Sequence, residues 1–286
     1  MLLRRALSAL ARPPELTAVQ QTALLTAYCR AWERAHTPKP LCDDPYAHVL
    51  VDALLSPSAR VAHEQSRLRA DGVEIMAVRT RVLDDWLTRV VVSRTAKGQQ
   101  VVLLGAGMDT RAFRLPLTAA TVFEIDSDAR VQDAKARVLS DAGAQRTCAR
   151  LVTVQADLAD PPASAAALCA AGLCARTPTH WVVEGLLEYL PRRTHAELFA
   201  MAARLGGAPG STLCAQVLEP SWADRLDELR VQLPYEPLAP VGESVDALEG
   251  AGWAPLHVLR RPDFEEMYPG RTPHPGFTMV VATRDV

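Results

Sequence analysis

An apolar run that ends in a glycine turn constrains this chain more than any other feature. Val101 to Leu104 are four consecutive apolar residues, which suits a parallel strand covered on both faces. Gly105 and Gly107 follow and let the backbone turn sharply, close to a ligand, where a Cβ atom would collide. The pattern predicts a buried strand whose carboxyl end opens into a binding site.

The next apolar run ends in an acid. Thr121 to Ile125 is typical of a neighbouring strand, and Asp126 follows at its carboxyl end, before a polar helix. An acid in this position can accept hydrogen bonds from both hydroxyls of a ribose. Glu124 should point to the same face, but Asp126 is nearer the strand end, where ligands bind in open sheets. Together, residues 101–139 predict the front half of a nucleotide-type site.

The turn also discriminates between cofactors. A dinucleotide fingerprint requires a third glycine, but Thr110 stands in its place, between Asp109 and Arg111. An acid at the turn would repel a pyrophosphate bound at a helix N-terminus. A cationic cofactor that carries an amino acid and a sulfonium suits the turn better. S-adenosylmethionine is such a cofactor.

Composition indicates one globular, enzyme-sized unit. The chain has 286 residues, of which 49% are hydrophobic, so it can bury a large core. The 31 Lys and Arg residues nearly balance the 33 Asp and Glu residues, which leaves a net charge of -2. We therefore expect neither a nucleic acid nor a membrane partner. The basic N-terminus lacks the apolar core and cleavage site of a signal peptide, and no later run suits a membrane span, so a cytoplasmic protein is expected.

The cysteines are scattered along the chain, without the C-x-x-C spacing of zinc or redox sites. We expect free, mostly buried thiols and no metal site. The six are Cys29, Cys42, Cys148, Cys169, Cys174 and Cys214.

The first third of the chain has helical patterns. A helix is expected from Thr17 until shortly before Pro38, and another begins where Asp44 is the N-cap and Pro45 the first helical residue. A third is expected over residues 73–91. Its apolar stripe consists of Ile75, Val78, Val82 and Trp86.

The remainder alternates between strand and helix patterns. Beyond the first two strands, we expect strands at 151–156, 181–183, 211–219, 254–260 and 276–284. Helices are expected in the alanine-rich segment after the third strand, at 194–205 and at 243–253. Strands separated by helices predict a mostly parallel sheet with helices on both faces, and the last two strands predict an antiparallel edge.

Six segments in order carry a specific resemblance. DDPYA, VRTRVLDDWL, GAGMDTRAFRL, FEID, VQADL and WVVEGLLEYLP resemble the leucine carboxyl methyltransferase family, which includes bacterial polyketide and peptide carboxyl O-methyltransferases. The resemblance implies a class I, S-adenosylmethionine-dependent methyltransferase with a Rossmann-like α/β fold and a seven-stranded sheet. It also implies an N-terminal helical cap at 1–98, a core at 99–286 and a substrate-cover insertion around 221–240.

The resemblance assigns roles at the methionyl end of the cofactor. Arg79 matches the arginine that pairs with the methionyl carboxylate, although Arg81 is a rival and a surface salt bridge is the plain alternative. Gly105 and Gly107 match the turn that passes under the methionyl part. Glu184 matches a residue near that group, where it would hold the ammonium or balance the sulfonium, or serve as a structural acid.

The other roles concern the nucleoside and the acceptor. Asp126 matches the ribose acid, while Asp157 and Leu158 match the pair that contacts adenine; an exposed N-cap is the alternative for Asp157. Tyr189 would face the acceptor as a catalytic candidate, or simply pack. Arg111, Arg114, Arg192 and Arg193 lie near the strand ends, but such arginines are more often on the surface, so none is assigned.

The implied reaction is direct displacement, in which an acceptor oxygen attacks the sulfonium methyl and S-adenosylhomocysteine leaves. A carboxylate is ionised at neutral pH and needs no general base. None of the seven histidines lies in a catalytic motif, which favours a carboxylate of a small molecule, natural-product intermediate or peptide C-terminus. The alternatives are a hydroxyl-directed O-methyltransferase, a non-catalytic cofactor-binding protein, or an NAD(P)-dependent oxidoreductase, which the missing third glycine argues against.

Overall fold

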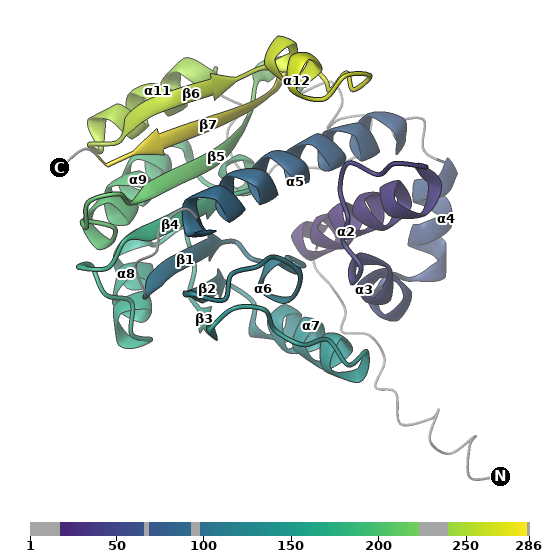
Figure 1. The fold of residues 1–286 in the computed structure, drawn as a ribbon, viewed down its shortest axis with the longest axis horizontal. Helices are drawn as coiled ribbons and strands as arrows, with labels where there is room; N and C mark the ends of the chain where they lie inside the picture. Colours follow the sequence, from purple (N-terminus) through teal and green to yellow (C-terminus); the bar gives the residue numbers. More distant parts are fainter. Residues whose placement is uncertain (1–17, 66–68, 93–97, 223–239, 285–286) are drawn as a thin grey trace, which may run out of the picture.

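A seven-stranded sheet forms the centre of the computed structural model, which describes residues 18–65, 69–92, 98–222 and 240–284 (Figure 1). Its strands are β1 (Gln99–Leu104), β2 (Ala120–Asp126), β3 (Arg150–Gln155), β4 (Thr179–Val183), β5 (Thr212–Leu218), β6 (Ala254–Leu259) and β7 (Phe277–Thr283). The order across the sheet is β3-β2-β1-β4-β5-β7-β6. The first five strands are parallel, and β7 is antiparallel to both β5 and β6. This confirms the predicted Rossmann-like fold with an antiparallel edge.

The strand order reverses direction at β1, which places a binding crevice there. β2 lies on one side of β1 and β4 on the other, and Leu104 is in register with Ile125 of β2 and Val183 of β4. The carboxyl ends of these three strands therefore meet at one edge of the sheet. In open α/β sheets ligands bind in the crevice outside such a switch point.

Helices cover both faces of the sheet, as the alternation of strands and helices predicted. On one face, α8 (Pro161–Ala170), α9 (Arg192–Leu205) and α11 (Val241–Gly250) pack against a cluster that includes Val102 and Trp181. On the other face, α5 (Arg69–Val92), α6 (Arg111–Arg114) and α12 (Arg261–Met267) pack against Val101 and Val182. Every residue of β1 and β4 is buried, including the two polar residues with which each strand begins, and the remainder of each strand is apolar.

The helices before the sheet form a cap beside the carboxyl ends of its strands (Figure 1). They are α2 (Ala18–His36), α3 (Ala47–Leu54), α4 (Pro57–Gln65) and α5. A third apolar cluster joins α2 and α3 to α7 (Ala129–Asp141), the polar helix that follows β2. Within the described residues the cap helices end at Val92 and β1 begins at Gln99, so the predicted boundary after residue 98 falls between them.

Two local features differ from expectation. The helix expected from Pro45 begins at Ala47, although the Asp44 carboxylate accepts from the backbone nitrogens of Tyr46 and Ala47, the bonds expected of an N-cap, while it also pairs with Arg30. Between the last two strands, α12 was not predicted, although Pro262 and Asp263 supply the start signal: Asp263 accepts from the backbone nitrogen of Arg260.

The predicted substrate cover at 221–240 falls mostly outside the described residues. The structure places its start, where Trp222 is buried in the short 3-10 turn η3 (Pro220–Trp222), and its last residue, Pro240. No described helix is long and apolar enough to cross a membrane.

Candidate active site

A cavity of about 910 Å³ lies at the carboxyl ends of β1, β2 and β4, against the cap helices α2 and α5. All eight residues singled out in the sequence line it: Arg79, Gly105, Gly107, Asp126, Asp157, Leu158, Glu184 and Tyr189. These residues come from separate segments between positions 79 and 189, and the fold brings them together around one cavity.

The glycine turn is closely packed on both sides. Gly105 and Gly107 have positive φ angles of 71° and 41°. A Cβ atom on Gly105 would lie 3.2 Å from Cδ1 of Leu186, and one on Gly107 would lie 3.2 Å from Cβ of Ala23 in α2. The positive φ angles favour glycine at both positions, and a larger residue would also have to displace the neighbouring side chain slightly.

Asp126 is the acid of β2 that reaches the cavity. Its Oδ2 accepts from the backbone nitrogen of Gly107 at 2.8 Å, which links the strand end to the glycine turn. Glu124, expected on the same face, is instead 2% exposed and pairs with Lys135 of α7 at 2.9 Å, and it is absent from the described cavity wall. Two residues further from the strand end, it lies under α7, and burial raises its pKa.

Asp157 and Leu158 follow β3 on the same side of the cavity. Asp157 is exposed and its Oδ1 accepts from the backbone nitrogen of Ala159 at 2.9 Å, while Leu158 is buried. The N-cap of α8 is Asp160, whose side chain accepts from Ala163. The alternative in which Asp157 caps this helix is therefore wrong.

Arg79 of α5 lies in the cavity wall, buried among polar partners. Its Nη1 donates to Oε1 of Gln216 at 2.7 Å, and its Nε lies 2.6 Å from Oε1 of Glu184 without the alignment of a hydrogen bond. Among the described contacts of Arg79, Nη2 is the nitrogen that remains for a ligand carboxylate. Arg81, the rival, is on the surface and pairs with Asp85, so the surface salt bridge describes Arg81 and not Arg79.

Glu184 joins two arginines. Its Oε1 contacts Arg79, and its Oε2 accepts from Nη1 of Arg111 at 2.5 Å. Burial alone would raise the pKa of Glu184, but the charges of Arg111 and Arg79 lower it to about 2. The carboxylate is therefore ionised and fully engaged by protein groups, although it still lines the cavity.

Arg111 and Arg114 of α6 are not surface arginines, contrary to expectation. Asp84 of α5 accepts from both of them, and Arg111 also pairs with Asp109 and Glu184. Their side chains are 3% and 6% exposed. By contrast, Arg192 pairs with Glu243 at a partly exposed position, and neither it nor Arg193 belongs to the described wall of the cavity.

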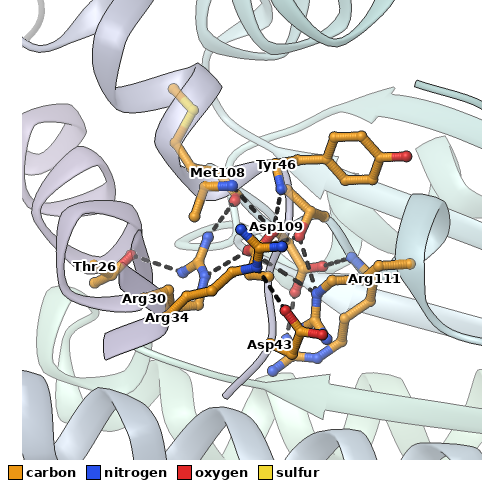
Figure 2. Close-up of polar contacts among 12 residues, drawn as sticks. Thr26, Arg30, Arg34, Asp43, Tyr46, Met108, Asp109 and Arg111 are labelled. Carbon is orange, nitrogen blue, oxygen red and sulfur yellow. Dashed lines mark hydrogen bonds and ion pairs between the residues drawn. The ribbon is translucent and has the colours of Figure 1, made fainter. Parts of the chain in front are cut away.

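The arginine network continues into the cap. Figure 2 shows Arg30 of α2 directed at the turn after β1, where its Nη2 donates to the carbonyl oxygen of Met108 at 2.7 Å. Its Nε donates to Asp44, which also accepts from the hydroxyl of Thr110. Nothing in the sequence pairs residues 30 and 44 with the turn, so this connection was missed.

The contacts of Asp109 alter the electrostatic argument made from the sequence. Its carboxylate accepts from the backbone nitrogen of Arg111 at 2.6 Å and pairs with the Arg111 guanidinium. The negative charge of Asp109 is thus largely balanced by Arg111. Asp109 would therefore repel the pyrophosphate of a dinucleotide less than the sequence suggested. The buried Thr110 in place of the third glycine remains a departure from the dinucleotide fingerprint.

The cap side of the cavity is apolar with hydroxyl groups. Leu25, Ile75, Met76, Leu218 and Trp222 contribute the apolar surface, and Thr22, Thr26, Tyr28 and Tyr189 carry hydroxyls. The hydroxyl of Tyr189 lies 3.4 Å from Oγ1 of Thr22, and burial together with the charge of Glu188 raises its pKa to about 12. Tyr189 is therefore protonated at neutral pH.

His63 and Glu188 are among the titratable residues of the wall that the sequence did not indicate. His63 of α4 lines the cavity with its ring 5.8 Å from that of Tyr28, and burial lowers its pKa. Glu188, in the 3-10 turn η2 (Leu187–Tyr189), also lines the cavity. His63 is on a short helix remote in sequence and lies in no pattern that indicates the site. Glu188 does lie in the segment WVVEGLLEYLP, but the resemblance assigned roles there only to Glu184 and Tyr189.

The cysteines are free thiols, four of them buried, Cys174 half-buried and Cys169 exposed. In the described part of the chain no group of three or more His, Cys, Asp or Glu residues is placed to hold a metal ion. The residues present do fit S-adenosylmethionine. The cavity offers an arginine for its carboxylate, acids at two strand ends for its nucleoside, and a glycine turn that allows close approach.

Comparison with known proteins agrees with this geometry. Residues 23–203 match the family model described as leucine carboxyl methyltransferase. A relative from Frankia alni is 38% identical over 274 residues, which cover 92% of this chain and 93% of its own. One from Streptomyces coelicolor is 45% identical over 210 residues, covering 68% of this chain and 65% of its own. Both bear the name "Putative S-adenosyl-L-methionine-dependent methyltransferase".

Solved structures show the same fold at low sequence identity. A DUF574 family protein from Streptomyces avermitilis superposes with a TM-score of 0.59 at 16% identity, covering 92% of this chain and 97% of its own. Magnesium protoporphyrin IX methyltransferase from Synechocystis, solved with bound S-adenosylhomocysteine, gives 0.51 at 12% identity, covering 77% and 88%. The chain belongs to the leucine carboxyl methyltransferase family and is a methyltransferase that uses S-adenosylmethionine.

Proposed function

We propose that the protein is a carboxyl O-methyltransferase that methylates a small molecule, a natural-product intermediate or a peptide C-terminus in the cytoplasm. The observation that carries the proposal is the composition of the cap side of the cavity. It presents apolar surface and hydroxyl groups, and the arginines that the cap contributes to the wall, Arg30 and Arg79, each contact a protein acid. Neither a nucleic acid nor a membrane takes part.

The cofactor would be held by residues of α5, of the end of β2 and of the segments that follow β3 and β4. Arg79 would bind the methionyl carboxylate, Asp126 the ribose hydroxyls, and Asp157 with Leu158 the adenine. We assign Glu184 a positioning role, because both of its oxygens contact arginines. When bound, S-adenosylmethionine supplies an electrophilic methyl group on a sulfonium.

The reaction that suits this wall is displacement by a carboxylate. The nucleophile is ionised at neutral pH, so no side chain has to remove a proton. Leu25, Ile75 and Met76 would exclude water from the acceptor oxygen, and the hydroxyls opposite would orient it. A new bond joins the acceptor oxygen to the methyl carbon as S-adenosylhomocysteine leaves, and the product is a methyl ester.

A hydroxyl acceptor is the second candidate, because one observation favours it. His63 lines the cavity and its lowered pKa keeps the imidazole neutral at pH 7, so it is able to take a proton from an alcohol or phenol. A carboxylate acceptor gives an ester and a hydroxyl acceptor gives an ether. The two products differ in their stability to base.

One experiment distinguishes them. The protein is incubated with S-adenosylmethionine labelled in the methyl group and with small-molecule extract, and the labelled product is isolated and treated with mild alkali. We expect release of the label as methanol, as from an ester. Label that remains attached after alkali, together with loss of turnover in His63→Gln, would support the ether and contradict the carboxylate proposal.

A further inference from the structure

Glu188 is a half-buried acid of the cavity wall that the proposed function does not use. It lies in η2, after β4, and its Oε2 is buried without a hydrogen-bond partner among the described residues. A buried carboxylate oxygen without a partner is costly, and buried polar groups in folded proteins nearly always have one. The position calls for a hydrogen-bond donor that comes from a ligand.

The other acids of the cavity wall already have partners within the protein. Asp109 pairs with Arg111, Asp126 accepts from Gly107, Asp128 pairs with Arg130, Asp157 accepts from Ala159, and Glu184 contacts Arg79 and Arg111. Glu188 is the exception among the lining acids that the structure describes. Its Oε2 is therefore a buried acceptor that a cationic donor entering the cavity could satisfy.

Glu184, by contrast, has no carboxylate oxygen left for a ligand cation. The sequence resemblance offered Glu184 as the residue that holds the cofactor's ammonium. In the structure each of its oxygens contacts an arginine, and two cations already balance its charge. Adding an ammonium there would place a third positive charge beside Arg79 and Arg111. A different acid is better suited to the ammonium.

The surroundings of Glu188 indicate which end of the cofactor it faces. Arg79 and Glu188 line the same cavity, and the chain just before Glu188 lies against Arg79: a Cβ atom on Gly185 would lie 3.5 Å from Nη1 of Arg79. Burial raises the pKa of Glu188, and the charge of Arg79 accordingly acts against it and lowers the pKa. Arg79 is the residue proposed to bind the methionyl carboxylate. In an amino acid the ammonium and the carboxylate are attached to the same carbon, so a group beside Arg79 is in position to meet the ammonium.

We propose that Glu188 binds the α-ammonium of the cofactor's methionyl group, while Arg79 binds its carboxylate. The inference rests on the proposed placement of the methionyl group at Arg79. Arg79 and Glu188 would form a pair of opposite charges that matches the two charges of the amino acid. Glu184 would hold Arg79 and Arg111 in place from behind. Glu188 is thus a cofactor-binding residue that determines affinity for the amino-acid part of the ligand.

Binding measurements without any acceptor test the proposal. Calorimetry compares the wild type with Glu188→Gln for three ligands: S-adenosylhomocysteine, its analogue without the amino group, and 5′-methylthioadenosine, which lacks the amino-acid part. We expect Glu188→Gln to weaken binding of S-adenosylhomocysteine roughly tenfold or more, since a hydrogen bond to a charged group is lost. Affinity for the other two ligands should be unchanged. Glu197→Gln, at an exposed position of α9, is the control and should alter none of the three.

The other outcomes overturn the proposal. Equal losses for all three ligands would mean that Glu188 maintains the shape of the cavity, and no loss for any would mean that it contacts neither group. Thermal unfolding of the ligand-free protein provides a second readout. Because Oε2 of Glu188 is buried without a hydrogen-bond partner among the described residues, neutralising this carboxylate should leave the stability of Glu188→Gln equal to or above that of the wild type, whereas a structural acid would lower it.

A separate variant tests whether the methionyl carboxylate lies at Arg79. If Arg79→Lys binds S-adenosylhomocysteine as tightly as the wild type, the methionyl carboxylate is not at Arg79, and the proposed placement is wrong. The ligand series with Glu188→Gln still reports whether the amino group contacts Glu188, because it compares ligands that differ in that group.

Discussion

Asp126 holds the glycine turn in place and, in our proposal, also binds the ribose of the cofactor. Its Oδ2 accepts from Gly107 and holds the glycine turn against β2, while the side chain faces the cavity. An amide in its place keeps one oxygen for Gly107 but cannot accept from two ribose hydroxyls. The two roles are therefore separable by a conservative substitution.

We expect Asp126→Asn to weaken binding of S-adenosylhomocysteine by roughly tenfold to a hundredfold, which corresponds to losing one or two hydrogen bonds to a charged acceptor. Calorimetry with S-adenosylhomocysteine and its 2′,3′-dideoxy analogue measures the effect. The dideoxy ligand should bind the wild type and the variant equally. An equal loss for both ligands would assign Asp126 to the turn alone.

The lowered pKa of Glu184 should make the stability of the folded protein depend on pH. Its pKa in the folded protein is about 2, below the value of about 4.3 for an unperturbed glutamate. A depressed pKa contributes stability that is fully present above the unfolded pKa and is lost as the pH falls towards the folded one. We therefore expect the wild type to exceed Glu184→Gln in denaturant midpoint at pH 7, with the difference shrinking between about pH 4.5 and pH 2.

Urea titrations at several pH values test this, with Glu197→Gln as the control. A difference between wild type and Glu184→Gln that stays constant from pH 7 to pH 2 would show that packing, and not the charge on Glu184, is responsible.

Ion pairs between separate elements connect the cap to the sheet. Asp84 of α5 holds Arg111 and Arg114 of α6, and Arg30 of α2 reaches the turn after β1. These partners are separated by 27 to 78 positions in the sequence. Each arginine, considered in its own segment, has the composition of a surface residue, which is why the network could not be predicted from local patterns.

The strands and turns of the site were predictable for the opposite reason. Gly105, Gly107 and Asp126 act through the local geometry of a strand end, and local geometry is encoded in adjacent residues. Asp157 follows β3 and lines the cavity, while its role at the adenine stays a prediction. Glu188 was not found, because its significance depends on what its neighbours leave unsatisfied, and this becomes visible only once Glu184 is seen between two arginines.

Asp84 and Asp85 offer a matched pair for testing the network. Asp84→Asn would leave Arg111 and Arg114 buried without their shared carboxylate, and we expect it to lower the free energy of unfolding by about 3 to 5 kcal/mol. Asp85 pairs with the exposed Arg81, so Asp85→Asn should cost less than about 1 kcal/mol. Urea denaturation measures both. Similar losses in the two variants would mean that the buried network adds nothing to stability.

The whole molecule is built so that one ligand touches both of its parts. The cavity wall combines residues of the cap, such as Thr22 and Arg79, with residues at the carboxyl ends of the strands, such as Asp126 and Glu184. A bound ligand would therefore connect α2 and α5 to the sheet.

We expect S-adenosylhomocysteine to stabilise the cap and the core together. At a ligand concentration of one hundred times Kd, linkage predicts a gain of about 2.7 kcal/mol in the free energy of unfolding, if the cap and the sheet unfold as one unit. Unfolding monitored by the tryptophans and by limited proteolysis of α2 to α4 should shift equally, since both report the same event. Asp126→Asn at the same ligand concentration should gain less, in proportion to its weaker affinity. If the ligand stabilises the core but leaves proteolysis of the cap unchanged, it binds at the strand ends without contacting the cap. That result would contradict a site shared between the cap and the sheet.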